Sequence, residues 1–208
     1  MSTEAYEEMV VGMAETMRSR FYGKYRGTVE DVEDPESLGR ITAKVPEILH
    51  DQVSPWALPA VAFAGPSHGL VLIREKGDGV WIEFEAGDPS RPIWTGGWWA
   101  SGELPEPGGT KSRVLVTSTG HKLVFDDENK EIHLLHSGGA ELVMTDSDIT
   151  MKIGQSETKM TSDQISLKIG TTEITMSTTE LTLKGGPTAQ VKLSSSGVEI
   201  NNGAMKVM

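Results

Sequence analysis

A sixteen-residue repeat in the C-terminal half constrains the fold of this chain more than any other feature. Three consecutive segments, beginning at Glu141, Glu157 and Glu173, each start with Glu and carry Met at the fourth position. They read ELVMTDSDITMKIGQS, ETKMTSDQISLKIGTT and EITMSTTELTLKGGPT. A repeat of fixed period predicts a solenoid, in which each unit stacks on the next.

Within the repeat, apolar residues come in pairs separated by one residue, as on one face of a β-strand. From Leu142 onward, the first members of successive pairs are 7, 9, 7, 9, 7, 10, 7 and 7 residues apart. Each sixteen-residue repeat therefore consists of two shorter units, and each unit is a strand followed by a polar turn. The residues predicted to form the core of this shaft are Leu142, Met144, Ile149, Met151, Ile165, Leu167, Ile174, Met176, Leu181, Leu183, Val191, Leu193, Val198 and Ile200.

A strand with two inward residues cannot enclose a core by itself, so the unit needs facing walls. A sixteen-residue coil within one chain supplies two walls. Alternatively, three chains wind around one another, and each supplies one wall of a triangular prism per short unit. In that arrangement every strand pairs with strands of the other two chains, and no chain has an exposed edge. The Asp, Ser and Gly residues between strands then form the corners.

Residues 24–99 change to short runs rich in β-branched and aromatic residues, separated by Gly, Pro and Asp. The runs YRGTVEDVED, LGRITAKV, PAVAFA, GLVLI and GVWIEFEA predict five strands of a small barrel. The segment 76–79 is predicted to be a hairpin turn, because its glycines tolerate positive φ. Trp81 and Phe84 are three apart, so we expect them on opposite faces of one strand.

Residues 1–23 are predicted to form an amphipathic helix, because apolar residues recur there every three or four positions. The helix either packs on its own domain or docks on a partner, for instance in a small trimeric bundle. Residues 100–119 include SGELPEPGGTKS and are predicted to be a Pro/Gly-rich linker, which leaves 120–208 for the shaft. The apolar face of the helix comprises Tyr6, Met9, Val10, Met13 and Met17.

Composition excludes several classes of protein. The net charge of −11 argues against nucleic-acid binding, which needs clustered Lys and Arg. Cysteine is absent, so disulfides and thiolate metal sites are excluded. The N-terminus MSTEAYEEMV is acidic and lacks the apolar segment of a secretory signal, and no apolar run is long enough to span a bilayer. We therefore expect a chain made in the cytoplasm without a signal peptide, and no cofactor.

Few residues suggest catalysis or metal binding. His133 and His136 are three apart and fall on opposite sides of a strand. His136 shares the side of Ile132 and Leu134, where three copies could ring a threefold axis around an ion; a turn or solvated histidine is the favoured interpretation. The acidic segment 126–128 lacks the spacing of a calcium loop and is predicted to be a turn. No Ser-His-Asp ordering or phosphate loop is present.

The barrel also carries a pattern of turns and strand starts: a Gly-Arg strand, a Trp, a Gly-Asp turn, and Gly-Asp-Pro-x-x-Pro. Its residues are Gly39, Arg40, Trp56, Gly77, Asp78, Gly87, Asp88, Pro89 and Pro92. This pattern resembles the OB-fold of the central spike proteins of contractile injection machines, such as phage baseplate assembly protein V and the VgrG spikes of type VI secretion. The repeat is similar to the family's trimeric needle. The resemblance implies an all-β fold: a small OB-fold barrel followed by a trimeric intertwined β-helix, with a short N-terminal α-helix.

The resemblance implies a structural spike at the centre of the baseplate of a contractile phage tail or phage-tail-like injection system. As a homotrimer, such a spike links the baseplate hub to a tip protein and punctures the target cell membrane when the sheath contracts. It is assembled into a phage virion, or into an extracellular or cytoplasmic phage-tail-like particle. The second hypothesis is an OB-fold binding module on a β-solenoid stalk that recognises surface glycans or another ligand.

Departures from the family pattern refine these expectations. No lysozyme-like domain fits between barrel and shaft, so the protein is not expected to be an enzyme. No hub domain precedes the barrel, so the hub is expected as a separate protein that contacts the helix face and the barrel. The C-terminus lacks the His-x-His pair with which some members bind a metal. Met205, Val207 and Met208 are expected to form a platform capped by a PAAR-repeat tip protein.

A tryptophan cluster, Trp94, Trp98 and Trp99, lies where the barrel ends. We expect it to make trimer or hub contacts; a carbohydrate platform is the alternative.

Overall fold

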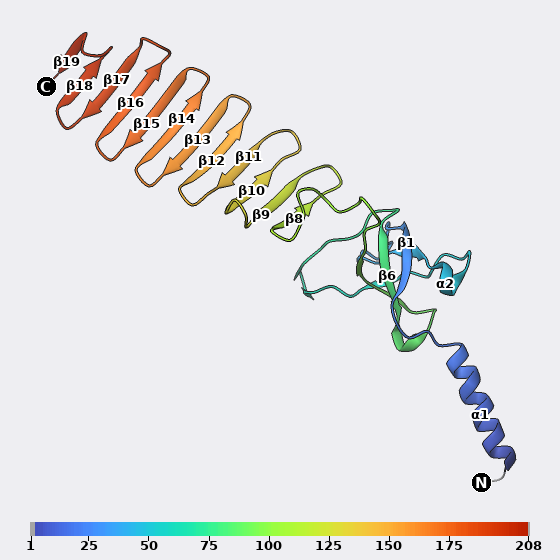
Figure 1. Ribbon diagram of the computed structural model, residues 1–208. Coiled ribbons are helices and arrows are strands. Elements are labelled where there is room, and N and C mark those ends of the chain that lie inside the picture. The colour runs from blue at the N-terminus through green and yellow to red at the C-terminus, as the bar shows by residue number, and fades with distance from the viewer. Residues whose placement is uncertain (1–2, 208) are drawn as a thin grey trace. The chain divides into compact units, whose positions relative to one another are not determined.

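The computed structural model describes residues 3–207. These residues form two compact units, one ending at Glu103 and the other beginning at Leu104. The described part of the chain is mostly β-structure with two α-helices. An OB-like sheet comes first, and a long antiparallel sheet consistent with a β-solenoid needle follows (Figure 1). The predicted fold class is confirmed at this level.

The first unit is built on a five-stranded sheet with the strand order β2-β1-β6-β7-β3. Its α-helices are α1 (Thr3–Arg18) and α2 (Pro46–Leu49), and a 3-10 turn, η1 (Glu85–Gly87), follows β6. The strands of the unit are β1 (Tyr25–Asp31), β2 (Thr42–Lys44), β3 (Leu58–Pro59), β4 (Ala64–Gly65), β5 (His68–Gly69), β6 (Gly79–Phe84) and β7 (Pro92–Gly97).

The core of this unit follows from the alternation along β6. Val80, Ile82 and Phe84 are buried, while the residues between them are partly exposed. Trp81 therefore lies on the outer face, as predicted from its spacing to Phe84. The buried cluster is completed by Val29, Ile41, Ala43, Val45, Ala57 and Trp94.

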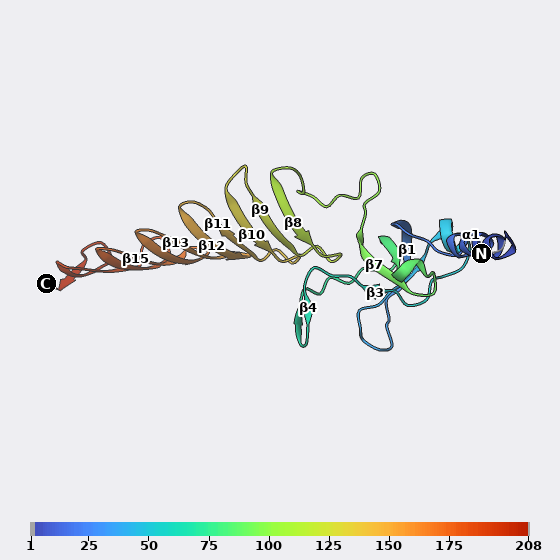
Figure 2. The same cartoon turned by 90° about the horizontal axis from the view of Figure 1, so that it is seen from below.

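Two of the five predicted barrel strands are wrong. The runs PAVAFA and GLVLI lie outside the five-stranded sheet, apart from Pro59 in β3, and flank a separate small hairpin, β4–β5. Figure 2 shows β4 projecting away from the sheet of its unit. The segment 76–79 does form a turn before β6, but no strand precedes it, so it does not close the predicted hairpin.

The fourth strand of the sheet in spatial order, β7, was missed because its sequence resembles a turn. Pro92 begins the strand, a position that tolerates the missing N–H. Gly96, at φ +140°, lies in an irregular stretch where the register shifts between Val80 opposite Gly97 and Ile82 opposite Trp94. Bulges of this kind are where Gly occurs inside strands.

The second unit is a twelve-stranded antiparallel sheet in which strands follow one another in sequence order (Figure 1). Its strands are β8 (Ser112–Val116), β9 (Lys122–Asp126), β10 (Glu131–Leu135), β11 (Glu141–Met144), β12 (Asp148–Ile153), β13 (Ser156–Thr161), β14 (Gln164–Ile169), β15 (Thr172–Ser177), β16 (Glu180–Gly185), β17 (Gln190–Ser194), β18 (Gly197–Ile200) and β19 (Met205–Val207). β8 lies inside the predicted linker 100–119, so the sheet begins earlier than the expected residue 120.

The pairing of these strands differs from the expectation of cross-chain ladders. Each strand between β8 and β19 pairs with its predecessor and its successor in the same chain. The residues expected to form prism corners form hairpin turns within the chain, because a short polar segment reverses an antiparallel pair.

Two kinds of turn explain the sixteen-residue period. The turns after β12 and β14 place Gly154 and Gly170 at φ +57° and +58°, a conformation that glycine adopts without strain. The turns after β11 and β13 use a hydroxyl instead. The Oγ1 of Thr161, for example, accepts hydrogen bonds from the backbone N–H groups of Asp163 and Gln164 at 3.3 and 3.1 Å. One full repeat is one hairpin plus both turns.

We name the two edges at which the strands end after the turns found there. The glycine edge contains Gly139, Gly154, Gly170 and Gly186, all at positive φ. The hydroxyl edge contains Thr145, Thr161, Ser177 and Ser194, each of which accepts backbone hydrogen bonds within its own turn.

Candidate functional site

The apolar pairs of the repeat fall on one face of the long sheet. Residues directly opposite each other in neighbouring strands share a face, and the register links them into two continuous rows. The first row is Leu115, Leu123, Leu134, Leu142, Met151, Thr158, Leu167, Ile174, Leu183, Val191, Ile200 and Met205. The second is Arg113, Phe125, Ile132, Met144, Ile149, Met160, Ile165, Met176, Leu181, Leu193 and Val198.

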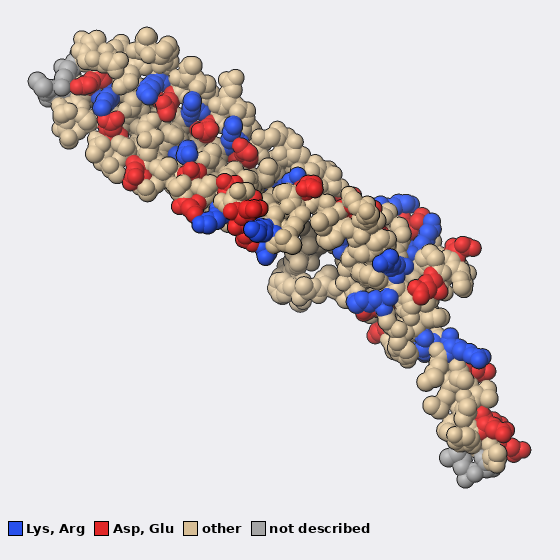
Figure 3. Space-filling view, in the orientation of Figure 1, with Lys and Arg blue, Asp and Glu red and all other residues tan. Residues whose placement is uncertain are grey.

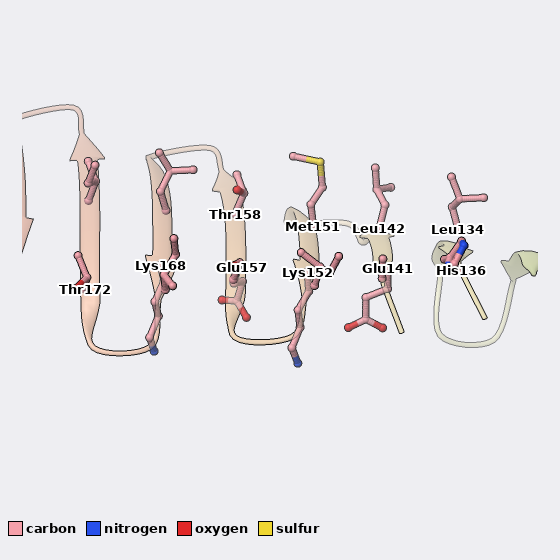
Figure 4. Close-up of a pocket in the computed structure, with 16 residues that line it drawn as sticks. Leu134, His136, Glu141, Leu142, Met151, Lys152, Glu157, Thr158, Lys168 and Thr172 are labelled. Carbon is pink, nitrogen blue, oxygen red and sulfur yellow. The ribbon is translucent and has the colours of Figure 1, made fainter. Parts of the chain in front are cut away.

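Every residue predicted for the shaft core belongs to one of these rows, yet the face is open in the single chain. Met151 and Leu167 are about half exposed, and so is Met176. The middle of the first row, from Leu134 to Ile174, lines a groove of about 640 Å³, in which Figure 4 shows the Leu134, Leu142 and Met151 side chains pointing the same way. A contiguous apolar face of this extent marks an interaction surface.

The opposite face is polar and carries a ladder of alternating charge. Glu141, Lys152, Glu157, Lys168, Glu173 and Lys184 follow one another in register across six strands. Figure 3 shows acidic and basic side chains alternating along this sheet. Lys184 pairs with Glu173 at 3.3 Å. Hydrogen bonding to Glu180 raises the pKa of Lys192 on the same face. The sheet therefore has one face suited to water and one suited to burial.

The predicted hub-binding helix is exposed on all sides. No residue of α1 is buried, and Tyr6, Met9, Val10, Met13 and Met17 are all well exposed to solvent. Packing of the helix on its own domain, one of the two alternatives raised by the sequence, is therefore wrong for the described residues. The helix offers an unoccupied apolar surface.

Arg40 and Trp56 of the barrel motif form one contact cluster. The Arg40 guanidinium pairs with Asp34 at 2.6 Å and lies 5.8 Å from the Trp56 ring. The nearly buried Asp34 carboxylate also accepts the Leu38 N–H at 2.7 Å. Hydrogen bonding from Arg40 holds the pKa of Asp34 far below its usual range. These contacts fix the loop between Asp34 and Arg40, and they use the charged groups of both residues.

The glycine and aspartate positions of the motif also stabilise turns. The Gly39 carbonyl accepts a hydrogen bond from Trp94 Nε1 at 3.1 Å, with Gly39 at φ +73°. Asp78, next to Gly77, accepts the Glu75 N–H at 2.9 Å.

At the end of β6, the Gly87 carbonyl accepts the Phe21 N–H at 2.8 Å. Asp88 pairs with Arg20 at 3.2 Å, and hydrogen bonds from Ser90 lower the Asp88 pKa. Pro89 follows in the loop, and Pro92 starts β7. The motif is a structural framework for the barrel.

The three tryptophans do not form one platform. Trp94 is 4% exposed and belongs to the core. The Arg26 guanidinium lies over both the Trp98 ring and the Trp81 ring, at 5.3 and 5.7 Å. Trp99 is 63% exposed. The expectation that all three share one contact surface is therefore wrong, because Trp94 faces inward with Ile82, its partner on β6.

The histidines are divided between the two faces, as their spacing predicted. His133 lies on the polar face, where its Nε2 is 2.8 Å from Glu131. His136 contacts His121 with ring centroids 4.5 Å apart, and its Nδ1 accepts the Gly138 N–H. His121 was missed because only the strand register brings it close. Within residues 3–207 no group of three or more His, Asp or Glu side chains is placed to hold a metal ion.

The acidic segment 126–128 forms the predicted turn. Asp126 accepts the N–H groups of Glu128 and Asn129, and Asp127 pairs with Arg113. At the other end of the sheet, Met205 is exposed on β19. Of the expected tip platform, Met208 and the side chain of Val207 lie outside the described residues.

A surface that sequence reasoning missed is the β4–β5 hairpin with its flanks. Residues 57–73 contain no charged side chain. Phe63, Leu70, Val71, Leu72 and Ile73 are all exposed. The absence of strict alternation in this run was the available signal that it is not a half-buried strand.

Comparison with known proteins agrees with the barrel and its motif. Residues 25–99 match the family described as the type VI secretion system/phage-baseplate injector OB domain. No curated protein matched the chain. None of the described helices has the length and apolarity required to cross a membrane. The matched family supports a structural role in a baseplate, in contact with other baseplate components. Over residues 25–99 the chain is therefore similar to the injector OB domain of type VI secretion systems and phage baseplates.

Proposed function

We propose that this protein is the central spike of a contractile phage tail or phage-tail-like injection particle. It acts as a homotrimer, joins the baseplate hub to a tip protein and pierces the target envelope when the sheath contracts. The observation that carries the proposal is the open apolar face of the twelve-stranded sheet, which follows an injector-type OB domain in the same chain.

The dimensions of the sheet favour three copies. A six-residue strand is about 20 Å long, and an equilateral prism with walls of that length has an inner radius of about 6 Å. Packed sheets are about 10 Å apart, so each wall supplies side chains to a depth of about 5 Å. Three walls therefore fill the prism with their own apolar rows and leave the charged faces in water. The residues predicted to form the core of the shaft then become buried.

The ends of the spike take different partners. The exposed α1 face, with Met9, Val10 and Met13, suits docking on a separate hub protein, because methionine side chains adapt to irregular surfaces. Met205 and its neighbours on β19 form the platform for a PAAR-repeat tip protein. The target membrane is contacted only during passage of the spike.

The mechanism is mechanical and not catalytic. Strands β9–β18 are hydrogen-bonded on both sides, so a load along the shaft is spread over a continuous ladder. Only β8 and β19 are edge strands of this sheet. Peeling a strand from an edge is the easiest way to open a sheet, and that route exists only at the two ends.

The alternative, a glycan-binding module on a stalk, draws on the aromatic residues of the barrel. Burial of Trp94 removes one member of that cluster, and Trp98 is stacked on Arg26. Trp99 remains exposed, so this alternative is tested by glycan-array binding.

Native mass spectrometry of the intact protein tests the proposal. The expected mass is three times 22.5 kDa. A monomer at micromolar concentration contradicts the proposal. A monomer that also binds glycans on an array favours the stalked binding module.

A further inference from the structure

We infer that neighbouring copies meet at each corner of the shaft through unlike edges, the glycine edge of one copy against the hydroxyl edge of the next. This inference rests on the proposed homotrimer and specifies the contact that holds it together. It is drawn from the chemistry of the two edges, which differ along the whole repeat.

The glycine edge carries apolar side chains that overhang the end of the sheet. Ile153 and Ile169 are 64% and 65% exposed, more than any other residue of the apolar face between β10 and β17. Each lies opposite a small polar partner, Ser156 or Thr172, in the adjacent strand. These isoleucines extend the apolar face beyond its two continuous rows, and only on this edge.

The glycine edge also carries lysines without an ion-pair partner inside the chain. Lys152 and Lys168 form no salt bridge among residues 3–207, whereas Lys184 pairs with Glu173. Figure 4 shows the Lys152 and Lys168 side chains running toward the turns at the ends of their strands. Their ammonium groups are therefore free to meet carboxylates of another copy.

The hydroxyl edge has the complementary character. Its turns at 145–147, 161–163, 177–179 and 194–196 contain only Thr, Ser and Asp. Asp163 has no salt bridge in the described part of the chain, and Asp146 has a single long one, 3.6 Å to Lys130. Next to these turns, Ile149 and Met160 face each other on the apolar face.

A threefold axis along the shaft brings these two edges together. Rotation by one third of a turn carries each sheet to the next wall, so every corner joins one glycine edge to one hydroxyl edge. Ile153 and Ile169 of one copy then cover Ile149 and Met160 of its neighbour on the inside of the corner. Lys152 and Lys168 approach the acidic turns on the outside. The contact is head-to-tail, and it closes after three copies.

Cysteine cross-linking of the full chain tests this arrangement, because the native sequence has no cysteine. Gln155 and Ser162 are exposed turn residues, on the glycine edge and the hydroxyl edge respectively. In the double variant Gln155→Cys/Ser162→Cys, a short bis-maleimide is expected to join three chains into a ring that runs as a trimer in SDS. The matched control, Gln155→Cys/Thr171→Cys, has both thiols on the glycine edge and is expected to remain a single chain in SDS.

The outcomes separate this inference from the proposed function. A monomeric native mass for the unmodified protein overturns the homotrimer, and the corner contact with it. A trimeric native mass without a covalent trimer from Gln155→Cys/Ser162→Cys overturns the corner contact alone. Inter-chain products from the same-edge control also overturn it, because they require like edges to meet. A covalent dimer as the largest product points to a two-walled assembly and contradicts both.

Discussion

Met151 on β12 lies directly opposite Leu142 on β11, and the next residue, Lys152, lies opposite Glu141 on the other face of the sheet. Two adjacent positions therefore test the two faces separately. The first contributes to the proposed buried core, and the second belongs to the charged ladder.

Met151→Asp is expected to abolish the trimer, because three carboxylates brought near one axis lose their hydration without gaining partners. Lys152→Asp is expected to leave the trimer intact, because the ion pairs it loses, with the charged ladder and with the acidic turn of the neighbouring copy, are solvent-exposed and contribute little beside the burial of the apolar rows. Native mass spectrometry of both variants is the measurement. If both variants assemble equally well, the assignment of the apolar face as the interior is wrong.

How far the sequence predicts this sheet depends on the property considered. The sequence shows that Leu142, Met144, Ile149 and Met151 share one face of the sheet, because strand side chains alternate with a period of two. The partner of each strand is not evident, because every unit presents the same apolar pair and neighbouring chains could supply it equally well. The turns at Gly154 and Thr161 decide the question by closing hairpins within the chain.

The barrel shows a different limit. β6 was predicted correctly because apolar residues alternate along it. β7 was missed because Pro92, Gly96 and Gly97 are residue types typical of turns. Only the bulge in the β6–β7 pairing makes them compatible with a strand. The β4–β5 region was assigned to strands on apolarity alone, although tertiary pairing decides whether such a run joins a sheet.

Trp94→Ala is expected to destabilise the barrel by about 3–5 kcal/mol, the usual cost of removing a large buried aromatic side chain. Trp99→Ala is expected to change the free energy of unfolding by about 0.5 kcal/mol or less, because surface substitutions rarely do more. Urea unfolding followed by fluorescence measures both. Equal effects would contradict the assignment of Trp94 to the core and Trp99 to the surface.

The Asp34–Arg40 pair predicts a pH dependence of stability. The pKa of Asp34 is lower in the folded protein than in the unfolded chain, so the contribution of this carboxylate is fully present above an unfolded pKa of about 4. It is lost as the pH falls below that value, because the unfolded chain then binds the proton first. Asp34→Asn removes the contribution at neutral pH.

Thermal unfolding of the wild type and Asp34→Asn between pH 7 and pH 2 is the measurement. The difference between their midpoints is expected to be largest at neutral pH and to shrink on acidification. Asp51→Asn provides a control, since Asp51 is exposed and forms no ion pair with the described residues. A constant difference between wild type and Asp34→Asn across the pH range contradicts the assigned role of the carboxylate.

Gly154→Ala is expected to destabilise the sheet by about 1 kcal/mol, because alanine is strained at the positive φ that this turn requires. Nothing lies within 4 Å of a Cβ added at this position, so the cost comes from the backbone and not from a clash. Gln155→Ala, one residue further along the same turn, is expected to be nearly neutral. A stability loss in Gln155→Ala equal to that in Gly154→Ala rules out backbone strain as the cause.

The exposed helix leads to a prediction about partner binding. Because no residue of α1 is buried, Met9→Glu/Met13→Glu is expected to leave the thermal midpoint and the trimeric mass unchanged. The same variant is expected to lose binding to the hub protein of the parent particle, since two carboxylates cannot be buried in an apolar contact without partners.

Glu8→Gln, on the same helix but outside this face, serves as the control and is expected to bind normally. Co-purification with the hub, expressed together with each variant, distinguishes the two outcomes. Retention of Met9→Glu/Met13→Glu by the hub would show that α1 is not the docking element, and would shift the search to the uncharged β4–β5 hairpin.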